Sequence, residues 1–164
     1  MTGKLRKDDT IRASTVVRAA PAEVFRVVSD PTRYPEWSPE CHRDACVDDT
    51  HFVGHNRRRR GRWKTTATVV ANEPDREFRF VVEMMGKDFT GWAYLVEPHA
   101  EGALLTEEFV MRVDLPLVAR LFEVLALGVR DRRTDLQGNL DRCVRTVRGI
   151  VEREVGERAP ADGR

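Results

Sequence analysis

Residues 11–40 read IRASTVVRAAPAEVFRVVSDPTRYPEWSPE, and successive patterns within this stretch predict its first elements. β-Branched residues concentrate in Thr10–Val17, which is typical of a strand. Pro21 follows, and a proline suits the first turn of a helix because it lacks an amide hydrogen. The helix that it opens ends at Ser29-Asp30-Pro31, because the residue before a proline avoids helical geometry. A second, shorter helical turn is expected over Thr32–Trp37.

Downstream of this opening, the chain alternates between extended segments and short turns. Turn residues such as glycine, proline and aspartate separate the segments, and connections this short join neighbouring antiparallel strands. The predicted strands are Cys41–Val47, His51–Arg58, Arg62–Asn72, Glu77–Met84, Phe89–Glu97 and Ala103–Val113.

The hydrophobic period changes after Pro116. Val118, Leu121, Phe122 and Leu125 first recur at three- and four-residue spacing. Gly128 interrupts this pattern, and a long amphipathic helix is predicted after it. Its apolar stripe is Leu136, Leu140, Val144, Val147 and Val151. The opposite face, which we expect to be solvated, carries Arg142, Arg145 and Arg153, with Arg132 and Arg148 at its flanks.

This order of elements predicts an α+β protein. A curved antiparallel sheet of about seven strands would wrap around the long C-terminal helix, with two short helices after the first strand. Where such a sheet curls strongly, the space between sheet and helix becomes a cavity, which is a natural ligand site. We expect one domain over residues 10–155, with flexible tails at 1–9 and 156–164.

Composition and charge exclude several classes of protein. The 164 residues are 41% hydrophobic, enough for a core, with 28 basic against 27 acidic residues. A balance this close to neutral argues against a nucleic-acid binder, and no apolar run is long enough to span a membrane. Asp8 and Asp9 stand where a signal peptide would place apolar residues. Three cysteines do not form a disulfide framework, so we expect a cytoplasmic protein.

Four short stretches resemble a known family. Ala20-Pro21-x-x-Val24-Phe25 is followed by Asp30-Pro31-x-x-Tyr34-Pro35-x-Trp37, and two later strands contain GWAYLVEP (91–98) and LLTEEF (104–109). Together they resemble the SRPBCC superfamily, the START/Bet v 1-like helix-grip proteins, and most closely its polyketide cyclase/dehydrase branch. The resemblance covers roughly residues 10–153.

The resemblance implies a hydrophobic cavity under the C-terminal helix. Members of the superfamily bind lipids, sterols, plant hormones or polyketides, and a minority catalyse reactions. Tetracenomycin-type aromatase/cyclases use a tyrosine just after the Trp-Pro-Glu-like segment and an arginine on a middle strand. Cys41 and Ala67-Thr68-Val69 occupy those places here, so the aromatase positions are not retained and catalysis is left open.

Glu107 is the candidate polar group of the cavity. Side chains alternate along a strand, so it shares a face with Leu105, Phe109, Met111 and Val113. A carboxyl in apolar surroundings has a raised pKa. We hypothesise that Glu107 anchors the ligand or acts as a general acid/base; the alternative is that it pairs with an arginine or faces solvent.

Aromatic side chains supply the candidate wall of the cavity, because they bury a large area with little loss of rotamer freedom. The alternative for each is ordinary core packing. With Glu107, the predicted ligand-binding residues are Tyr34, Trp37, Phe52, Trp63, Phe80, Trp92, Tyr94, Phe109, Phe122 and Leu140.

No metal or cofactor site is expected. His51 and His55 would lie about 13 Å apart on a strand, too far to share one ion. Cys41 and Cys46 would point to opposite faces of their strand. The cysteines are better explained as small apolar residues, with Cys143 beside the helix stripe.

Arg57-Arg58-Arg59-Arg60 is the strongest local charge feature. It could hold an acidic partner, such as a carrier protein or an anionic membrane surface. The alternative is an exposed hairpin tip with solvated arginines.

Together these features favour binding or transport of a hydrophobic small molecule, lipid or polyketide-like, by a monomer or homodimer. One alternative is a polyketide cyclase/dehydratase that uses Glu107 with a cavity arginine, Tyr34 or Tyr94. Another is a protein-interaction module that uses the arginine-rich hairpin. We expect 86–88 and Leu115–Gly128 to cover the cavity entrance.

Overall fold

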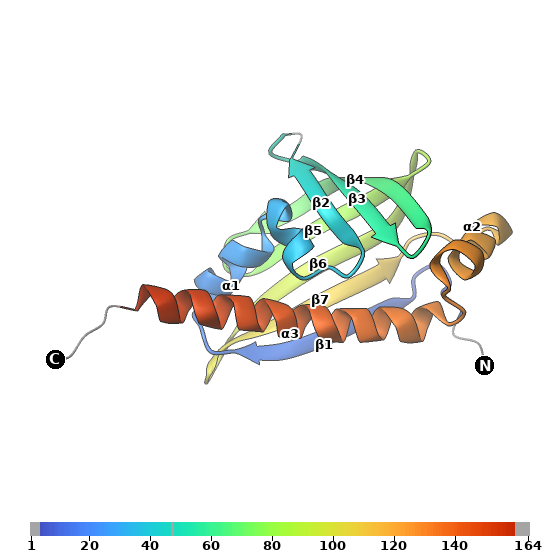
Figure 1. Ribbon diagram of the computed structural model, residues 1–164. Helices are drawn as coiled ribbons and strands as arrows, with labels where there is room; N and C mark the ends of the chain where they lie inside the picture. Colours follow the sequence, from blue (N-terminus) through green and yellow to red (C-terminus); the bar gives the residue numbers. More distant parts are fainter. Residues whose placement is uncertain (1–3, 47, 160–164) are drawn as a thin grey trace.

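The protein is built on one seven-stranded antiparallel sheet, shown by a computed structural model that describes residues 4–46 and 48–159 (Figure 1). The sheet order is β1-β7-β6-β5-β4-β3-β2, so β2 to β7 form the predicted meander and β1 returns beside β7. The predicted end of the second strand, Val47, lies outside the described residues. The strands are β1 (Thr10–Val17), β2 (Cys41–Cys46), β3 (His51–Arg58), β4 (Gly61–Glu73), β5 (Glu77–Met84), β6 (Lys87–His99) and β7 (Gly102–Met111).

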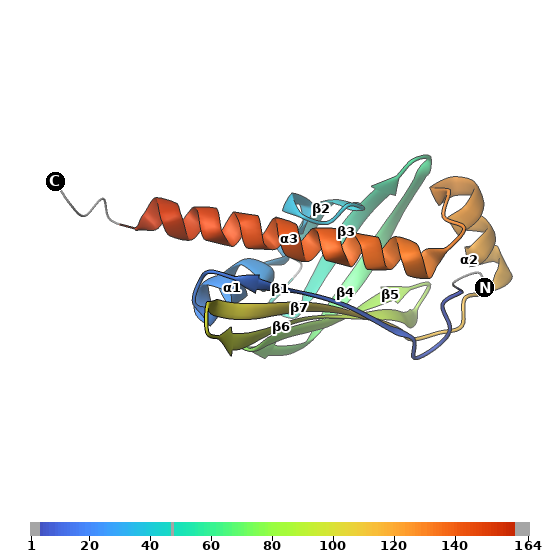
Figure 2. The ribbon, with the colours of Figure 1, turned by 90° about the horizontal axis from the view of Figure 1, so that it is seen from below.

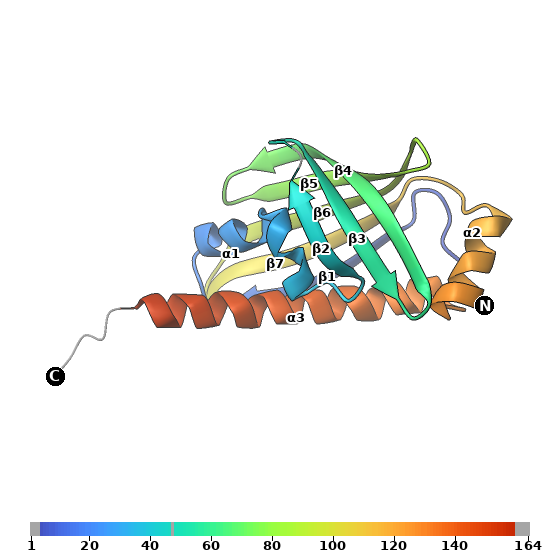
Figure 3. The same ribbon diagram turned by 45° about the horizontal axis from the view of Figure 1, so that its top comes forward.

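The sheet is strongly curved. Its register shifts within the β2–β3, β4–β5 and β5–β6 pairs, and irregularities of this kind bend strands. β2 and β3 consequently turn away from β6 and β7, so the sheet forms a trough (Figures 2 and 3). The long helix α3 (Arg132–Arg158) lies along this trough and gives the predicted α+β helix-grip arrangement.

Helix α3 has the predicted apolar stripe. Asp131 caps its first turn by accepting a hydrogen bond from the Thr134 amide (3.0 Å). All five predicted stripe residues are buried, together with Asn139, Cys143 and Ile150. Two expected tail boundaries differ from the structure. α3 continues to Arg158, which pairs with Glu23, and Leu5 is 2% exposed because it packs into the core.

Two short helices fill one end of the trough. α1 (Pro21–Val28) begins with Pro21 in its first turn, as predicted, and η1 (Pro31–Glu36) follows. α1 buries Val24, Phe25, Val27 and Val28 and packs against α3, β6 and β7. This end of the molecule is therefore a filled core.

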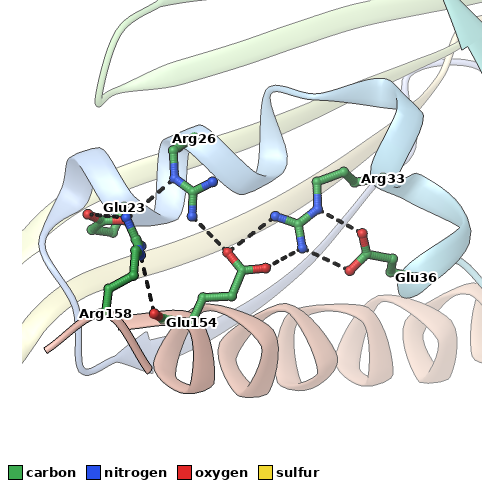
Figure 4. Close-up of polar contacts among 6 residues, drawn as sticks. All are labelled: Glu23, Arg26, Arg33, Glu36, Glu154 and Arg158. Atoms are coloured by element: carbon green, nitrogen blue, oxygen red, sulfur yellow. Dashed lines mark hydrogen bonds and ion pairs between the residues drawn. The ribbon is translucent and has the colours of Figure 1, made fainter. Parts of the chain in front are cut away.

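Ion pairs fix α3 to these helices (Figure 4). Glu154 accepts hydrogen bonds from Arg26 of α1 (2.7 Å) and from Arg33 of η1 (2.5 Å). Arg33 also binds Glu36, and Arg158 binds Glu23. The hydrogen bonds from Arg33 and Arg26 lower the pKa of Glu154 to about 2. The C-terminal half of α3 is thus held by both packing and charge.

The other end of the trough is covered differently. α2 (Leu117–Phe122) and η2 (Glu123–Leu127), a single π-helical turn, connect β7 to α3. They project beyond the sheet near the tip of the β3–β4 hairpin (Figures 1 and 3). Among the residues of α2 none is buried, so this end is not a filled core.

Two glycines on the exposed face of α3 give a test of the helix. A Cβ at Gly138 or Gly149 would meet no atom within 4 Å. Replacement of either by alanine should therefore raise the free energy of unfolding by about 1 kcal/mol, measured by urea denaturation. Gly102→Ala is the control that should destabilise the protein, because Gly102 has φ +138° and its Cβ would collide with the backbone of Val17 and Ala19. Equal effects at all three positions would contradict this account.

Candidate functional site

A cavity of about 560 Å³ lies between the concave face of the sheet and the N-terminal half of α3. This volume is within the range of small-molecule sites in proteins. All eleven residues predicted to bind ligand line it: Tyr34, Trp37, Phe52, Trp63, Phe80, Trp92, Tyr94, Glu107, Phe109, Phe122 and Leu140. The alternation of side chains along the strands therefore places the predicted wall on the cavity side.

The cavity has an inner end and a mouth. Along β7, Glu107, Phe109 and Met111 line it, whereas Leu105 is buried in the filled core. Along α3, the lining stops at Cys143. The inner end is therefore the layer of Glu107 and Cys143, and the mouth lies toward α2 and the β5–β6 turn.

Aromatic rings surround the inner end. Tyr34 is their centre, with ring centroids 5.3 Å from Trp37, 5.8 Å from Phe52, 5.7 Å from Phe80 and 5.9 Å from Tyr94. The Tyr34 hydroxyl donates to the carbonyl of Val28 (3.3 Å), so α1 and η1 fix this ring. Such rings present a rigid, largely apolar surface to a ligand.

A chain of hydrogen bonds crosses this aromatic layer. Trp37 Nε1 donates to the Tyr94 hydroxyl (3.1 Å), which donates to Glu107 Oε1 (3.1 Å). The other carboxyl oxygen, Oε2, is buried and has no hydrogen-bond partner within the described chain. Tyr94 is thus a tyrosine that donates a hydrogen bond to the candidate acid.

The sequence left open that Glu107 pairs with an arginine or faces solvent. The structure supports neither, because within the described ranges Glu107 has no arginine partner and its side chain is buried. It is 3% exposed, and burial raises its pKa to about 8, an effect that the Tyr94 hydroxyl and the Cys143 thiol partly offset. Burial and the Glu107 charge also raise the pKa of Tyr94 well above its usual value. Near neutral pH, Glu107 is therefore mostly a neutral acid.

Cys143 lies beside this carboxyl. Its Sγ donates to the carbonyl of Trp37 (3.3 Å) and lies close enough to the Glu107 carboxyl to lower the pKa of that group, but not in a geometry that gives Oε2 a hydrogen-bond partner. Burial, with the nearby Glu107 charge, raises the pKa of the Cys143 thiol. This cysteine is a buried, protonated thiol, as the sequence indicated.

At the mouth, the arginine run is divided between two roles. The predicted solvated tip holds for Arg57, Arg59 and Arg60, which are exposed. Arg58 instead makes a two-point ion pair with Asp135 (2.6 and 2.8 Å) and contacts Glu40. Arg58 is at the end of β3, and its side chain reaches the first turn of α3.

Arg132 also departs from its predicted solvated position. It binds Glu40, Asp135 and Glu123 and lines the cavity. With Arg58 these residues form a half-buried ionic cluster that joins β3, η2 and the start of α3.

Sequence reasoning missed several lining residues. Leu5 is one apolar residue within a charged segment, and Asn139 is a polar residue at the edge of the helix stripe. A search for hydrophobic periodicity does not detect either residue. Within the described ranges, no cluster of three or more His, Cys, Asp or Glu is arranged to hold a metal ion, and no helix is long and apolar enough to cross a membrane.

The cavity and the fold agree with the protein family whose model matches this sequence. A family model described as polyketide cyclase/dehydrase and lipid transport matches residues 8–148. The chain belongs to this family. The resemblance to the SRPBCC superfamily is thereby confirmed, and family membership supports a hydrophobic ligand-binding or cyclase role.

Solved structures show the same fold. A polyketide-cyclase-like protein from Corynebacterium glutamicum is 27% identical, with 95% of this chain and 99% of that one covered and a TM-score of 0.61. The di-domain ARO/CYC protein of the steffimycin biosynthetic pathway is 16% identical, with 90% and 51% covered and a TM-score of 0.69. A START superfamily protein from Mycobacterium smegmatis is 15% identical, with 88% and 98% covered and a TM-score of 0.64. Among curated proteins, no sequence match is found.

The raised pKa of Glu107 predicts how stability changes with pH. Between its ordinary value of 4.5 and about 8, the folded protein keeps a proton that the unfolded chain releases. Stability should therefore fall as pH rises through this window, by up to about 1.4 kcal/mol per unit, and level off above it. Glu107→Gln should remove this decline, measured as free energy of unfolding at several pH values.

Glu108, on the opposite face of β7, is the matched control. Burial acts to raise its pKa, but hydrogen bonds from Arg12 and Arg79 hold it below the usual value. The ionised Glu108 carboxylate therefore stabilises the folded protein above about pH 4.5, and this stabilisation is lost as pH falls. If the free energy of unfolding of Glu107→Gln changed with pH in the same way as that of the wild type, Glu107 would titrate normally.

Proposed function

We propose that this member of the family binds a largely apolar small molecule, lipid-like or polyketide-like, with a hydrogen-bonding group at the inner end of the cavity. The observation that carries this proposal is the combination of a 560 Å³ space, walls of aromatic and aliphatic side chains, and one buried carboxyl at its inner layer. Apolar walls supply affinity, and a few fixed polar groups orient the ligand.

The direction of the hydrogen bonds indicates what the ligand offers at that end. Glu107 Oε1 already accepts from Tyr94, so the proton of the neutral acid belongs on Oε2. Oε2 finds no acceptor among the described residues. A carbonyl oxygen of the ligand, reached by a small rotation of the side chain, would complete this chain of donors.

All three tryptophans, Trp37, Trp63 and Trp92, line the cavity, so ligand binding can be followed by their fluorescence. We expect a flat polycyclic hydroxyketone (emodin), a long-chain fatty acid (palmitate) or both to change this signal saturably. Ala67→Phe, on the β4 wall of the cavity, should weaken binding at least tenfold by filling the space. Thr66→Phe, the next position on β4, points to the other face and should not. If neither probe binds, or if both variants bind like the wild type, the cavity is not the binding site.

Glu107 is tested by two substitutions with different polarity. Glu107→Leu removes the donor and should weaken binding of the hydroxyketone about tenfold, the effect of losing one buried hydrogen bond. Glu107→Gln keeps both an acceptor for Tyr94 and a donor for the ligand, so it should bind nearly as the wild type does. Equal loss in both variants would remove the proposed donor role.

The second candidate is a polyketide cyclase or dehydratase, and the Glu107–Tyr94 pair favours it. A carboxyl with a pKa near 8 in an apolar site is suited to transfer protons at neutral pH. Native mass spectrometry of the purified protein, followed by denaturation, would identify any ligand that copurifies. An enzyme releases that ligand changed, for example with loss of water, and Glu107→Gln should stop the change without abolishing binding. A carrier releases it unchanged.

A further inference from the structure

The segment at the cavity mouth exposes an unusual number of large apolar side chains. Within α2 and η2, Leu117 is 78% exposed, Val118 79% and Leu125 71%, and Leu121, Phe122 and Val124 are also exposed. Met85, on the β5–β6 turn at the rim of the same cavity, is 94% exposed. Apart from Val70 on β4, these are the large apolar residues that the described chain leaves exposed.

Exposed arginines border this apolar group. Arg57, Arg59, Arg60 and Arg62 lie at the β3–β4 turn, and Arg120 lies on α2. None of the five forms an ion pair with any residue that the structure describes. The sole acidic residue of 57–62 and 117–127 is Glu123, which is half-buried and paired with Arg132.

Packing contacts hold the turn and the helix together as one surface. The Trp63 and Phe122 rings meet edge to face, with centroids 6.2 Å apart. Gly61 lies against Leu127 and Phe122, and a Cβ at this position would press on both side chains. The Arg59 side chain lies over Gly128, whose φ of +69° ends η2. Val118 and Phe122 also line the cavity, so this surface borders its opening.

We propose that α2, η2 and the β3–β4 turn form a docking surface for an anionic lipid bilayer, with the cavity mouth facing the membrane. Short helical segments with exposed leucine, valine and phenylalanine beside arginines enter the interface of such a bilayer, where apolar side chains reach the acyl boundary and arginines meet headgroup charge. The helical segment projects beyond the sheet, which lets it reach a membrane without hindrance from the rest of the fold (Figure 1).

The charge of the surface favours a bilayer over a second copy of the chain. A symmetric dimer through this surface would bring the unpaired arginines of one copy toward those of the other. An anionic membrane instead offers many negative groups and an apolar layer beneath them. The proposal rests on the proposed hydrophobic ligand, because it names the source or destination of that ligand.

Vesicle cosedimentation of the full chain tests this proposal without any added ligand. The wild type should bind phosphatidylcholine vesicles containing about one third phosphatidylglycerol, bind pure phosphatidylcholine much less, and weaken in high salt. Arg57, Arg59 and Arg60 changed together to glutamine should lower the partition constant roughly 100-fold, since each arginine contributes about fivefold. Leu121→Ser with Leu125→Ser should lower it at least tenfold.

Matched controls lie elsewhere on the molecule. Arg142, Arg145 and Arg153 on the exposed face of α3, changed to glutamine, remove the same charge, and Val70→Ser removes an exposed apolar group of the sheet. Neither control should change vesicle binding. Tryptophan fluorescence with emodin or palmitate should be the same in all variants, so loss of docking and loss of cavity binding are separable.

Three results would overturn the proposal. The first is wild-type binding no stronger to anionic than to zwitterionic vesicles. The second is equal weakening by the control and the surface substitutions. The third is a concentration-dependent dimer, seen by sedimentation velocity, that the leucine substitutions abolish, because a second copy would then be what covers this surface.

Discussion

The trough of the sheet is longer than the core that fills it, and this constraint determines the rest of the structure. α1 occupies only one end, where its valines close against β6, β7 and the C-terminal half of α3. The ion pairs of Glu154 with Arg26 and Arg33 fix α3 to α1 and η1 there. The N-terminal half of α3 then extends over a part of the sheet that no other helix of residues 4–46 and 48–159 fills, and the cavity is the space that remains.

The buried carboxyl gains its properties from this same division. Glu107 lies where the filled core ends and the cavity begins, so protein surrounds it, but of the residues that the structure describes only Tyr94 donates to it in good geometry. A carboxyl that keeps its hydration, or that lies beside a cation, does not have its pKa raised in this way. The chemistry of Glu107 is therefore a property of depth within the trough as much as of residue type.

Local pattern was sufficient to predict the elements and the inner face of the sheet. β-Branched segments between short turns become antiparallel strands almost by necessity, and alternation then fixes which side Trp92, Tyr94, Glu107 and Phe109 face. The α3 stripe follows from its period in the same way. The lining of the cavity was predictable because it is the apolar side of regular elements.

The features of the site that could not be predicted depend on contacts between residues that are distant in sequence. Arg58 and Arg132 belong to charged runs that look solvated, yet Asp135 and Glu40 bring both into one half-buried cluster. Leu5 is buried although its neighbours in sequence are charged. Nothing in the sequence near Cys143 indicates that its thiol lies between Trp37 and Glu107. Hydrophobic periodicity predicts which residues are buried, but it does not predict which residues they contact.

The pairing of β1 with β7 has a consequence for how the protein is made. Thr10 lies opposite Val110 and Val17 opposite Ala103, so the strand nearest the N-terminus completes its hydrogen bonds with the last strand of the sheet. During synthesis, β1 leaves the ribosome long before its partner exists, and α3 emerges later still. A fold with such distant contacts forms slowly, and β1 remains without its partner strand until the five strands between them have been synthesised.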